Sequence, residues 1–445
     1  MLTPSRRSVS PGRFSGRNRL VLAVSSALEQ AGGMLVAPVV IVAVSSLLTT
    51  DLLDMVLPGV AATVAWIFGY AAVPVMLSRA RRRLPWTIGA SIVRAASLAL
   101  LAYVLASDDV DREQRLRSIL ICVSAYALAA GLARGASEAL DALVTTARRP
   151  RRSDGLVALL PPALVLLVGL ASFTLLVDVP RSPLPRLSVL FVLGAGLSGA
   201  ATLLLGRIVE SPNLAPVDRR RSVAHAGWRR QMPSLAWLAV SAIIGAAELL
   251  LVVGLVRYME LPRAYLLSGL GVFLAASAVA AVGGGWVGRA VPFRAFIQVG
   301  AVLSGIAFAL AIGLPTLLET DRAPEMLLGR QPAEVGVWVA MALVGVSHQA
   351  RRRVLPRLID HTSTAPSLLN VAGFALAFTP LPLAMLMERW EPRSWLIVGL
   401  GAALTGIAVG GIISPRRVAV RTSRQSVGGW RAARPLRSAG GRYGL

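Results

Sequence analysis

The chain has 445 residues, of which 55% are hydrophobic, and its net charge is +24 because 46 basic residues outnumber 22 acidic ones. All the basic residues are arginine, and the mean hydropathy is +0.66. Apolar runs this long exclude an ordinary soluble globular protein. The single cysteine, Cys122, excludes a disulfide framework and a cysteine-rich metal site.

Twelve apolar stretches come close to the roughly 20 residues that a helix needs to cross a bilayer. In chain order they are 20–48, 54–77, 84–106, 118–146, 156–177, 188–209, 235–256, 265–288, 295–318, 335–350, 367–387 and 395–413. We expect each to be a transmembrane helix, because a helix satisfies its own backbone polar groups in hydrocarbon. The tenth is the weakest, since its apolar part is short before Arg351.

The arginines gather in every second connection, and the intervening loops hold most of the acids. The basic segments are the N-terminal tail, 79–83, 148–152, 219–230, 351–357 and the C-terminal tail. This alternation predicts that both termini and the middle loop are cytoplasmic. We expect the arginine runs to contact anionic lipids rather than nucleic acid. The use of arginine alone, with much alanine and glycine, suggests a GC-rich bacterial genome and therefore the bacterial inner membrane.

A basic middle segment divides the spans six and six. The expected parts are a tail at 1–19, a bundle at 20–209, a loop at 210–234, a bundle at 235–413 and a disordered basic tail at 414–445. An internal repeat supports this division. Pro85 aligns with Pro292 at an offset of 207, and Gly131 aligns with Gly345 at an offset of 214. The second alignment places Glu138 opposite Arg352.

With these features the chain resembles the major facilitator superfamily, in a divergent form. The loop after the eighth span keeps the family's Gly285 and basic Arg294, but has Arg289 where an acid is usual. The resemblance implies an all-α polytopic membrane protein with twelve helices in two pseudo-symmetric bundles that rock about a midplane site. It implies that spans 1, 4, 7 and 10 line a central cavity. It also implies gating loops that contain Arg79, Arg81, Arg82, Arg83, Gly285, Arg289 and Arg294.

Ionisable and amide side chains interrupt several apolar spans. Burying a charge there costs about 2.5–3.5 kcal/mol on insertion scales, so such residues are candidates for a substrate or proton pathway. The candidates are Glu29, Gln30, Arg134, Glu138, Asp141, Glu248, His348, Gln349 and Asn370. Arg134, Glu138 and Asp141 share a helix face at i, i+4 and i+7, so neighbours among them can pair.

Each candidate also has a structural interpretation. The charges could form static ion pairs between helices, Asp141 could reach the headgroups, and Asn370 could join two helices. His348 could lie near the interface and bond a neighbour. Arg94, in the peripheral third span, is expected to snorkel or to pair with a neighbouring helix.

The sequence contains no phosphate-binding Gly-Lys loop, no hydrolase signature and no acidic cluster spaced for a catalytic metal. We therefore expect no enzyme, cofactor or metal. The expected function is monomeric secondary transport of a small molecule by alternating access, as proton-coupled efflux by an antiporter. Glu29 and Glu248 would be proton carriers or substrate counter-ions, and Arg134 would bind an anionic group or tune Glu138. The alternative is a non-transporting protein on the same fold, either a receptor or an assembly factor.

Overall fold

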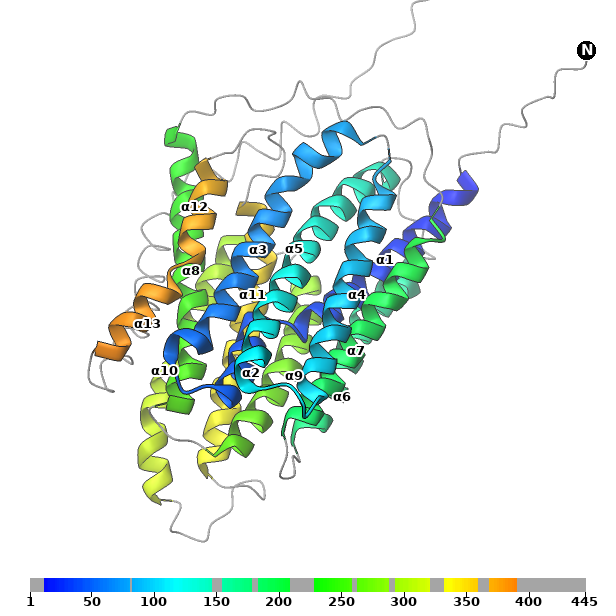
Figure 1. Ribbon diagram of the computed structural model, residues 1–445. Helices are drawn as coiled ribbons and strands as arrows, with labels where there is room; N and C mark the ends of the chain where they lie inside the picture. The colour runs from blue at the N-terminus through cyan, green and yellow to red at the C-terminus, as the bar shows by residue number, and fades with distance from the viewer. Residues whose placement is uncertain are drawn as a thin grey trace, which may run out of the picture.

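The computed structural model describes residues 12–80, 82–145, 154–177, 183–208, 228–257, 262–287, 293–320, 332–358 and 368–389. These residues are almost entirely helical (Figure 1). The first half contains α1 (Gly12–Met34), α2 (Pro38–Leu48), α3 (Leu52–Arg79), α4 (Leu84–Ala106), α5 (Arg112–Thr145), α6 (Asp154–Val177) and α7 (Pro183–Leu205). The second half contains α8 (Trp228–Arg257), α9 (Arg263–Val287), α10 (Phe293–Thr320), α11 (Pro332–Leu358), α12 (Leu368–Ala377) and α13 (Pro380–Arg389).

Seven helical segments in these described ranges are long and apolar enough to cross a membrane. Three shorter apolar helices cover 162–177, 295–311 and 369–385. Together they coincide with ten of the predicted spans. The predicted span 395–413 lies outside the described residues, as do residues 209–227 of the middle segment, and residues 228–234 form the first turns of α8.

Two predicted spans are interrupted, and proline begins the second part of each. The first span is divided into α1 and α2, with Ala37 in an extended conformation (φ −57°, ψ 142°) before Pro38. The eleventh is divided into α12 and α13 before Pro380. Proline has no N–H to donate and disfavours a helical conformation at the preceding residue, so a new helix begins at each proline.

The helix that contains the predicted tenth span does not end before Arg351. Helix α11 continues to Leu358 and includes three consecutive arginines that the sequence had assigned to a cytoplasmic loop. Arg351, Arg352 and Arg353 are each half-buried between helices. Arg351 and Arg353 donate to partners on neighbouring helices, Glu248 of α8 and the carbonyl oxygen of Ala281 on α9. Such contacts cannot be recognised from the length of an apolar run.

Each half packs around its own central helices. In the first half α5 packs on α3 and α4, and α7 packs on α4 and α1. In the second half α11 packs on α9 and α10, while α8 contacts α10, α11 and α12. The halves meet where α6 packs on α9 and where α12 and α13 pack on α3 (Figure 1). These two contacts pair spans 5 and 8 and spans 11 and 2, so exchanging the halves converts one contact into the other.

Two glycines show the repeat at atomic detail. A Cβ on Gly131 of α5 would collide with the carbonyl oxygen of Trp66 and the backbone nitrogen of Tyr70 on α3. A Cβ on Gly345 of α11 would collide with the carbonyl oxygen of Phe273 at 2.6 Å and make a tight contact with the backbone nitrogen of Ser277 at 3.2 Å, both on α9. The offsets of 207 and 214 found in the sequence relate both members of these contacts. Glycine permits close helix contact at the corresponding place in both halves.

Candidate functional site

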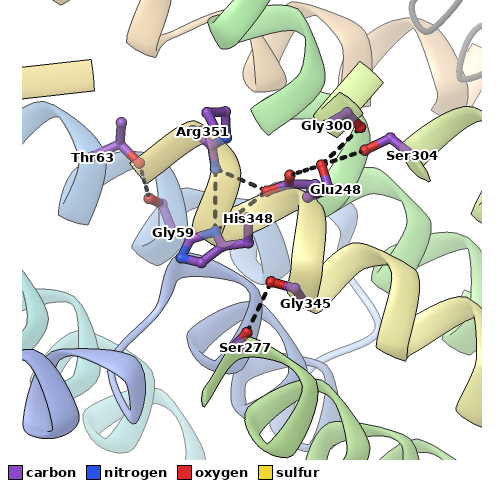
Figure 2. A network of polar contacts seen from close by, with 10 residues as sticks. Gly59, Thr63, Glu248, Ser277, Gly300, Ser304, Gly345, His348 and Arg351 are labelled. Carbon is purple, nitrogen blue, oxygen red and sulfur yellow. Dashed lines mark hydrogen bonds and ion pairs between the residues drawn. The ribbon is translucent and has the colours of Figure 1, made fainter. Parts of the chain in front are cut away.

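Glu248 of α8 is fully buried and lies at the centre of a polar network in the second half (Figure 2). Arg351 Nη2 donates to its Oε2 at 2.9 Å, and Ser347 Oγ donates to its Oε1 at 2.8 Å. His348 Nδ1 lies 3.4 Å from Oε2. Ser347 Oγ is also 2.8 Å from Ser304 Oγ of α10, so the carboxylate joins three helices.

The carboxylate of Glu29 on α1 has a comparable place in the first half. Arg94 Nη1 of α4 lies 3.3 Å from Oε2, and Ser91 Oγ donates to Oε1 at 2.6 Å. Arg94 Nη2 also donates to the backbone oxygen of Glu29 and to Tyr126 Oη of α5, each at 3.0 Å. The expectation that Arg94 pairs with a neighbouring helix is confirmed. Its partner is the carboxylate that the sequence had singled out as a transport residue.

The predicted pairing on α5 is also present. Arg134 Nε donates to Glu138 Oε1 at 2.6 Å, and Tyr70 Oη of α3 donates to Oε2 at 2.8 Å. The Arg134 side chain remains 51% exposed and that of Glu138 29% exposed, unlike the buried pairs at Glu29 and Glu248. This pair is therefore the most accessible of the three intramembrane pairs. Asp141 follows on the same helix, and its side chain lies outside the described part of the chain.

Arg351, Arg352 and Arg353 of α11 point toward three different helices, and each guanidinium lies close to a glycine of that helix. A Cβ on Gly245 of α8 would lie 2.6 Å from Arg351 Nη1. A Cβ on Gly33 of α1 would lie 2.5 Å from Arg352 Nη2, and one on Gly284 of α9 would lie 2.6 Å from Arg353 Nη1. Successive helical residues point about 100° apart, which explains the three directions.

The sequence prediction missed these roles of the arginines because it treated the run as a loop. Arg353 Nη2 also donates to the carbonyl oxygen of Ala281 on α9. The signal that could have identified them was the paired Gly245 and Glu248 in the seventh span, which leave room and charge for a guanidinium. Because those partners lie about a hundred residues away, nothing local to α11 reveals them.

The remaining predicted residues do not join one site. Gln349 is buried on α11, Gln30 is half-buried beside Glu29, and Asn370 is half-buried in the first turn of α12. Arg82 is exposed and Arg83 half-buried between α3 and α4. Arg81, Arg289 and the side chains of Arg79 and Arg294 lie outside the described residues, and Gly285 is in the last turn of α9.

A pocket lies between the two halves. The first half contributes α2 and α3, and the second half contributes α8, α11, α12 and α13. The lining residues are Pro38, Thr63, Ile67, Leu238, Ser241, Ala242, Gly245, Ala246, Leu249, Arg351, Leu355, Gly373, Leu376, Ala377 and Pro380. Two polar atoms of this lining, Ser241 Oγ and Arg351 Nε, are buried and make no hydrogen bond within the described ranges. An apolar pocket with a few convergent polar groups is typical of a small-molecule site.

No protein-family model matches the sequence, and no curated protein matches it. Solved structures do. A D-xylose–proton symporter aligns with a TM-score of 0.59 and 12% identity over 90% of this chain and 97% of that one. The xylose transporter XylE from E. coli, in a partially occluded inward-open conformation, aligns with a TM-score of 0.56 and 14% identity over 90% of this chain and 98% of that one. The D323A mutant of the nucleoside transporter NupG aligns with a TM-score of 0.55 and 11% identity over 89% of this chain and 98% of that one.

These matches define the class first: an all-α polytopic membrane protein whose solved structural neighbours are transporters rather than enzymes. The fold is that of the major facilitator superfamily, and the described helices account for eleven of the twelve predicted spans. The fold class expected from the sequence is confirmed. At identities this low the likeness concerns the fold, and the substrate has to be argued from this chain's own residues.

Proposed function

We propose that the protein is a secondary transporter that carries a small organic molecule across the membrane by alternating access. The observation that carries this proposal is the pocket lined by both halves. Movement of one half against the other changes which side of the membrane such a pocket opens to. A pocket inside one bundle would instead move with that bundle and keep its shape. Its lining is mostly apolar with Arg351, Ser241 and Thr63 as polar points, which suits an organic molecule with a hydrogen-bond acceptor.

Glu248 is the residue that we propose couples transport to protons. It lies behind Arg351, which lines the pocket, and its carboxylate binds Arg351, Ser347 and His348. A ligand group that accepts from Arg351 would compete with Glu248 for the guanidinium. The carboxylate released from that ion pair would then take up a proton. Glu29 can act in the same way in the first half, because Arg94 is shared between Glu29 and Tyr126.

The direction that we propose is export from the cytoplasm, as antiport against protons, in a bacterial inner membrane. The arginine-rich connections support cytoplasmic termini, and they support contact with anionic lipid headgroups. The N-terminal end of α1, the Arg79 end of α3 and the N-terminal end of α8 lie at the same end of the bundle (Figure 1). Monomeric protein is expected to suffice for transport, since the proposed pathway lies within one chain.

The test is accumulation of a broad compound panel in an efflux-deficient bacterial host. Cells would express wild type, Glu248→Gln, Glu29→Gln or the exposed-pair control Glu113→Gln at equal membrane levels. We expect lower accumulation of at least one compound with wild type and the control, and loss of this effect with Glu248→Gln and Glu29→Gln. Equal accumulation of every compound in expressing and empty cells would contradict export.

A receptor or assembly factor on the same fold is the competing function. Its partner would bind loop or lipid-facing surfaces, so the pocket substitutions Ser241→Ala and Thr63→Ala would leave its function intact. A transporter should instead change its substrate range or apparent affinity with these substitutions. The pocket between the halves favours transport, because a scaffold has no need for a mostly apolar pocket with a few polar groups at that place.

A further inference from the structure

Arg352 differs from three other arginines of the helical bundle. Arg94, Arg134 and Arg351 each pair with a glutamate. Arg352 makes no ion pair with any residue that the structure describes, and its Nη1 is buried without a hydrogen-bond partner. A guanidinium stays charged in proteins, so it cannot relieve this cost by losing its proton. A half-buried cation without an acidic partner favours the binding of an anion.

Arg352 reaches across the interface between the halves. It belongs to α11, yet its Nη2 lies 2.5 Å from the position of a Cβ on Gly33 of α1. Tyr126 Oη of α5 lies 3.5 Å from that same position. Arg134 and Arg94, both in the first half, lie within electrostatic range of Arg352. Glu138 and Glu29 already neutralise these two arginines. The positive charge of Arg352 therefore has no counter-ion among the described residues where the halves meet.

Two further donors accompany Arg352, one on its own helix and one across the interface between the halves. Gln349, one turn earlier on α11, is 2% exposed, and its buried Nε2 makes no hydrogen bond within the described ranges. The Tyr126 hydroxyl accepts from Arg94 Nη2, and this contact leaves its own proton for another acceptor. A guanidinium, an amide N–H and a phenol therefore present donors for which the described part of the chain supplies no acceptor. This donor set fits an oxyanion, because guanidinium matches carboxylate and phosphate geometry with two parallel bonds.

We propose that Arg352, Gln349 and Tyr126 form a binding site for an oxyanion, a carboxylate or phosphate group, between the two halves. The inference rests on the proposed transport function and names its substrate class: an organic molecule that carries a carboxylate or phosphate. Arg352 contacts the anion, and Gly33 provides the space in which the guanidinium approaches α1. Because Arg352 and Tyr126 belong to different halves, an anion held by both ties the halves together.

The test is thermal unfolding of purified full-length protein in detergent, titrated with inorganic phosphate or benzoate at constant ionic strength, with chloride as the reference. A ligand that binds the folded state raises the unfolding temperature as its concentration rises. We expect a saturable rise for wild type with phosphate or benzoate. We expect the apparent affinity to fall by about tenfold or more in Arg352→Gln, because a charge-assisted bidentate contact is lost. The matched control is Arg353→Gln, which removes the same charge from the next residue and should keep the wild-type response.

Gly33→Ala is the second variant, and it keeps the whole charge set. Its methyl would lie only 2.5 Å from Arg352 Nη2, so the guanidinium must shift and anion affinity should fall even though the protein folds. Phosphatidylglycerol in mixed micelles separates the two sources of such a group. Stabilisation by phosphatidylglycerol with none by the soluble anions would assign the site to a lipid headgroup and overturn the proposal. No anion response in wild type, or an equal response in Arg352→Gln, would also overturn it.

The outcomes remain distinct from those of the transport proposal. If wild type exports only neutral or cationic compounds and shows no anion response, transport stands and the oxyanion site fails. If soluble anions stabilise wild type in an Arg352-dependent manner while no compound is transported, the site stands and transport fails.

Discussion

Arg351 donates to Glu248 at 2.9 Å across the contact between α11 and α8, with the carboxylate fully buried and the guanidinium half-buried. The arginine belongs to a basic run that resembles a loop, and the glutamate interrupts the apolar seventh span. Either charge alone would be costly to bury among the helices. Together they form an ion pair that borders the pocket between the halves.

Replacing Glu248 with glutamine should destabilise the fold strongly, because it leaves Arg351 and its charge without a carboxylate. Breaking a buried pair by removing one partner costs about 3–5 kcal/mol. The measurement is chemical or thermal unfolding in detergent. The control is Glu113→Gln, which breaks the exposed Arg117–Glu113 pair, where both side chains are at least 73% exposed, and should cost about 0–1 kcal/mol. Equal stability losses in the two variants would contradict the role assigned to Glu248.

The double variant Glu248→Gln/Arg351→Gln should be more stable than Glu248→Gln alone. Removing the second charge removes the unpaired cation, so the effects of the two substitutions should not add. Unfolding of both single variants and the double variant gives the coupling free energy. A coupling near zero would show that the two side chains do not depend on each other.

A methyl added at Gly131 in the first half, or at Gly345 in the second, should lower the free energy of unfolding by similar amounts. In each case the new Cβ would meet backbone atoms of the neighbouring helix, which cannot rotate away. We expect Gly131→Ala and Gly345→Ala each to cost about 1–3 kcal/mol through overpacking. The control is Gly199→Ala in α7, where nothing lies within 4 Å of the new methyl, and where alanine should be neutral or stabilising by about 0.5–1 kcal/mol. Thermal unfolding compares the three, and a neutral Gly345→Ala would contradict the close contact of α11 with α9.

Asp51 should stabilise the start of α3 as its N-cap. Its Oδ1 accepts from the backbone nitrogens of Leu53 at 2.8 Å and Asp54 at 3.2 Å. Asp51→Ala removes these contacts and should cost about 0.5–2 kcal/mol, while Asp51→Asn keeps an acceptor and should cost much less. Unfolding of the two variants side by side tests this, and equal losses would show that the cap contributes little.

The sequence predicted most of the fold, for physical reasons. The length of an apolar run identifies a membrane helix, because a segment in hydrocarbon must be apolar and must satisfy its own backbone hydrogen bonds. Gly131 and Gly345 reveal the internal repeat, because close contact between helix backbones requires glycine at both positions. The Arg134–Glu138 pair was predictable because i and i+4 are adjacent on a helix. The break before Pro38 was overlooked, although proline indicates it directly.

The candidate site was only partly predictable, because its contacts join distant parts of the chain. Nothing near Glu29 reveals that Arg94 and Ser91 bind it from α4. Nothing near Arg352 reveals that Gly33 and Tyr126 face it from the first half. Judged by apolar residues alone, the tenth span would end at the three arginines. In the folded protein the helix continues, because glycines on other helices leave space for the guanidinium groups and Glu248 pairs with Arg351.

Flux by the purified protein tests the central claim most directly. Protein reconstituted into vesicles would be assayed with a labelled panel of carboxylates, phosphates, neutral compounds and cations, with and without an imposed proton gradient. The account predicts saturable flux of at least one compound by wild type, and its loss in a folded Glu248→Gln variant. Flux equal to that of protein-free vesicles for every compound, with folded wild-type protein, would contradict it and favour a non-transporting receptor or assembly factor.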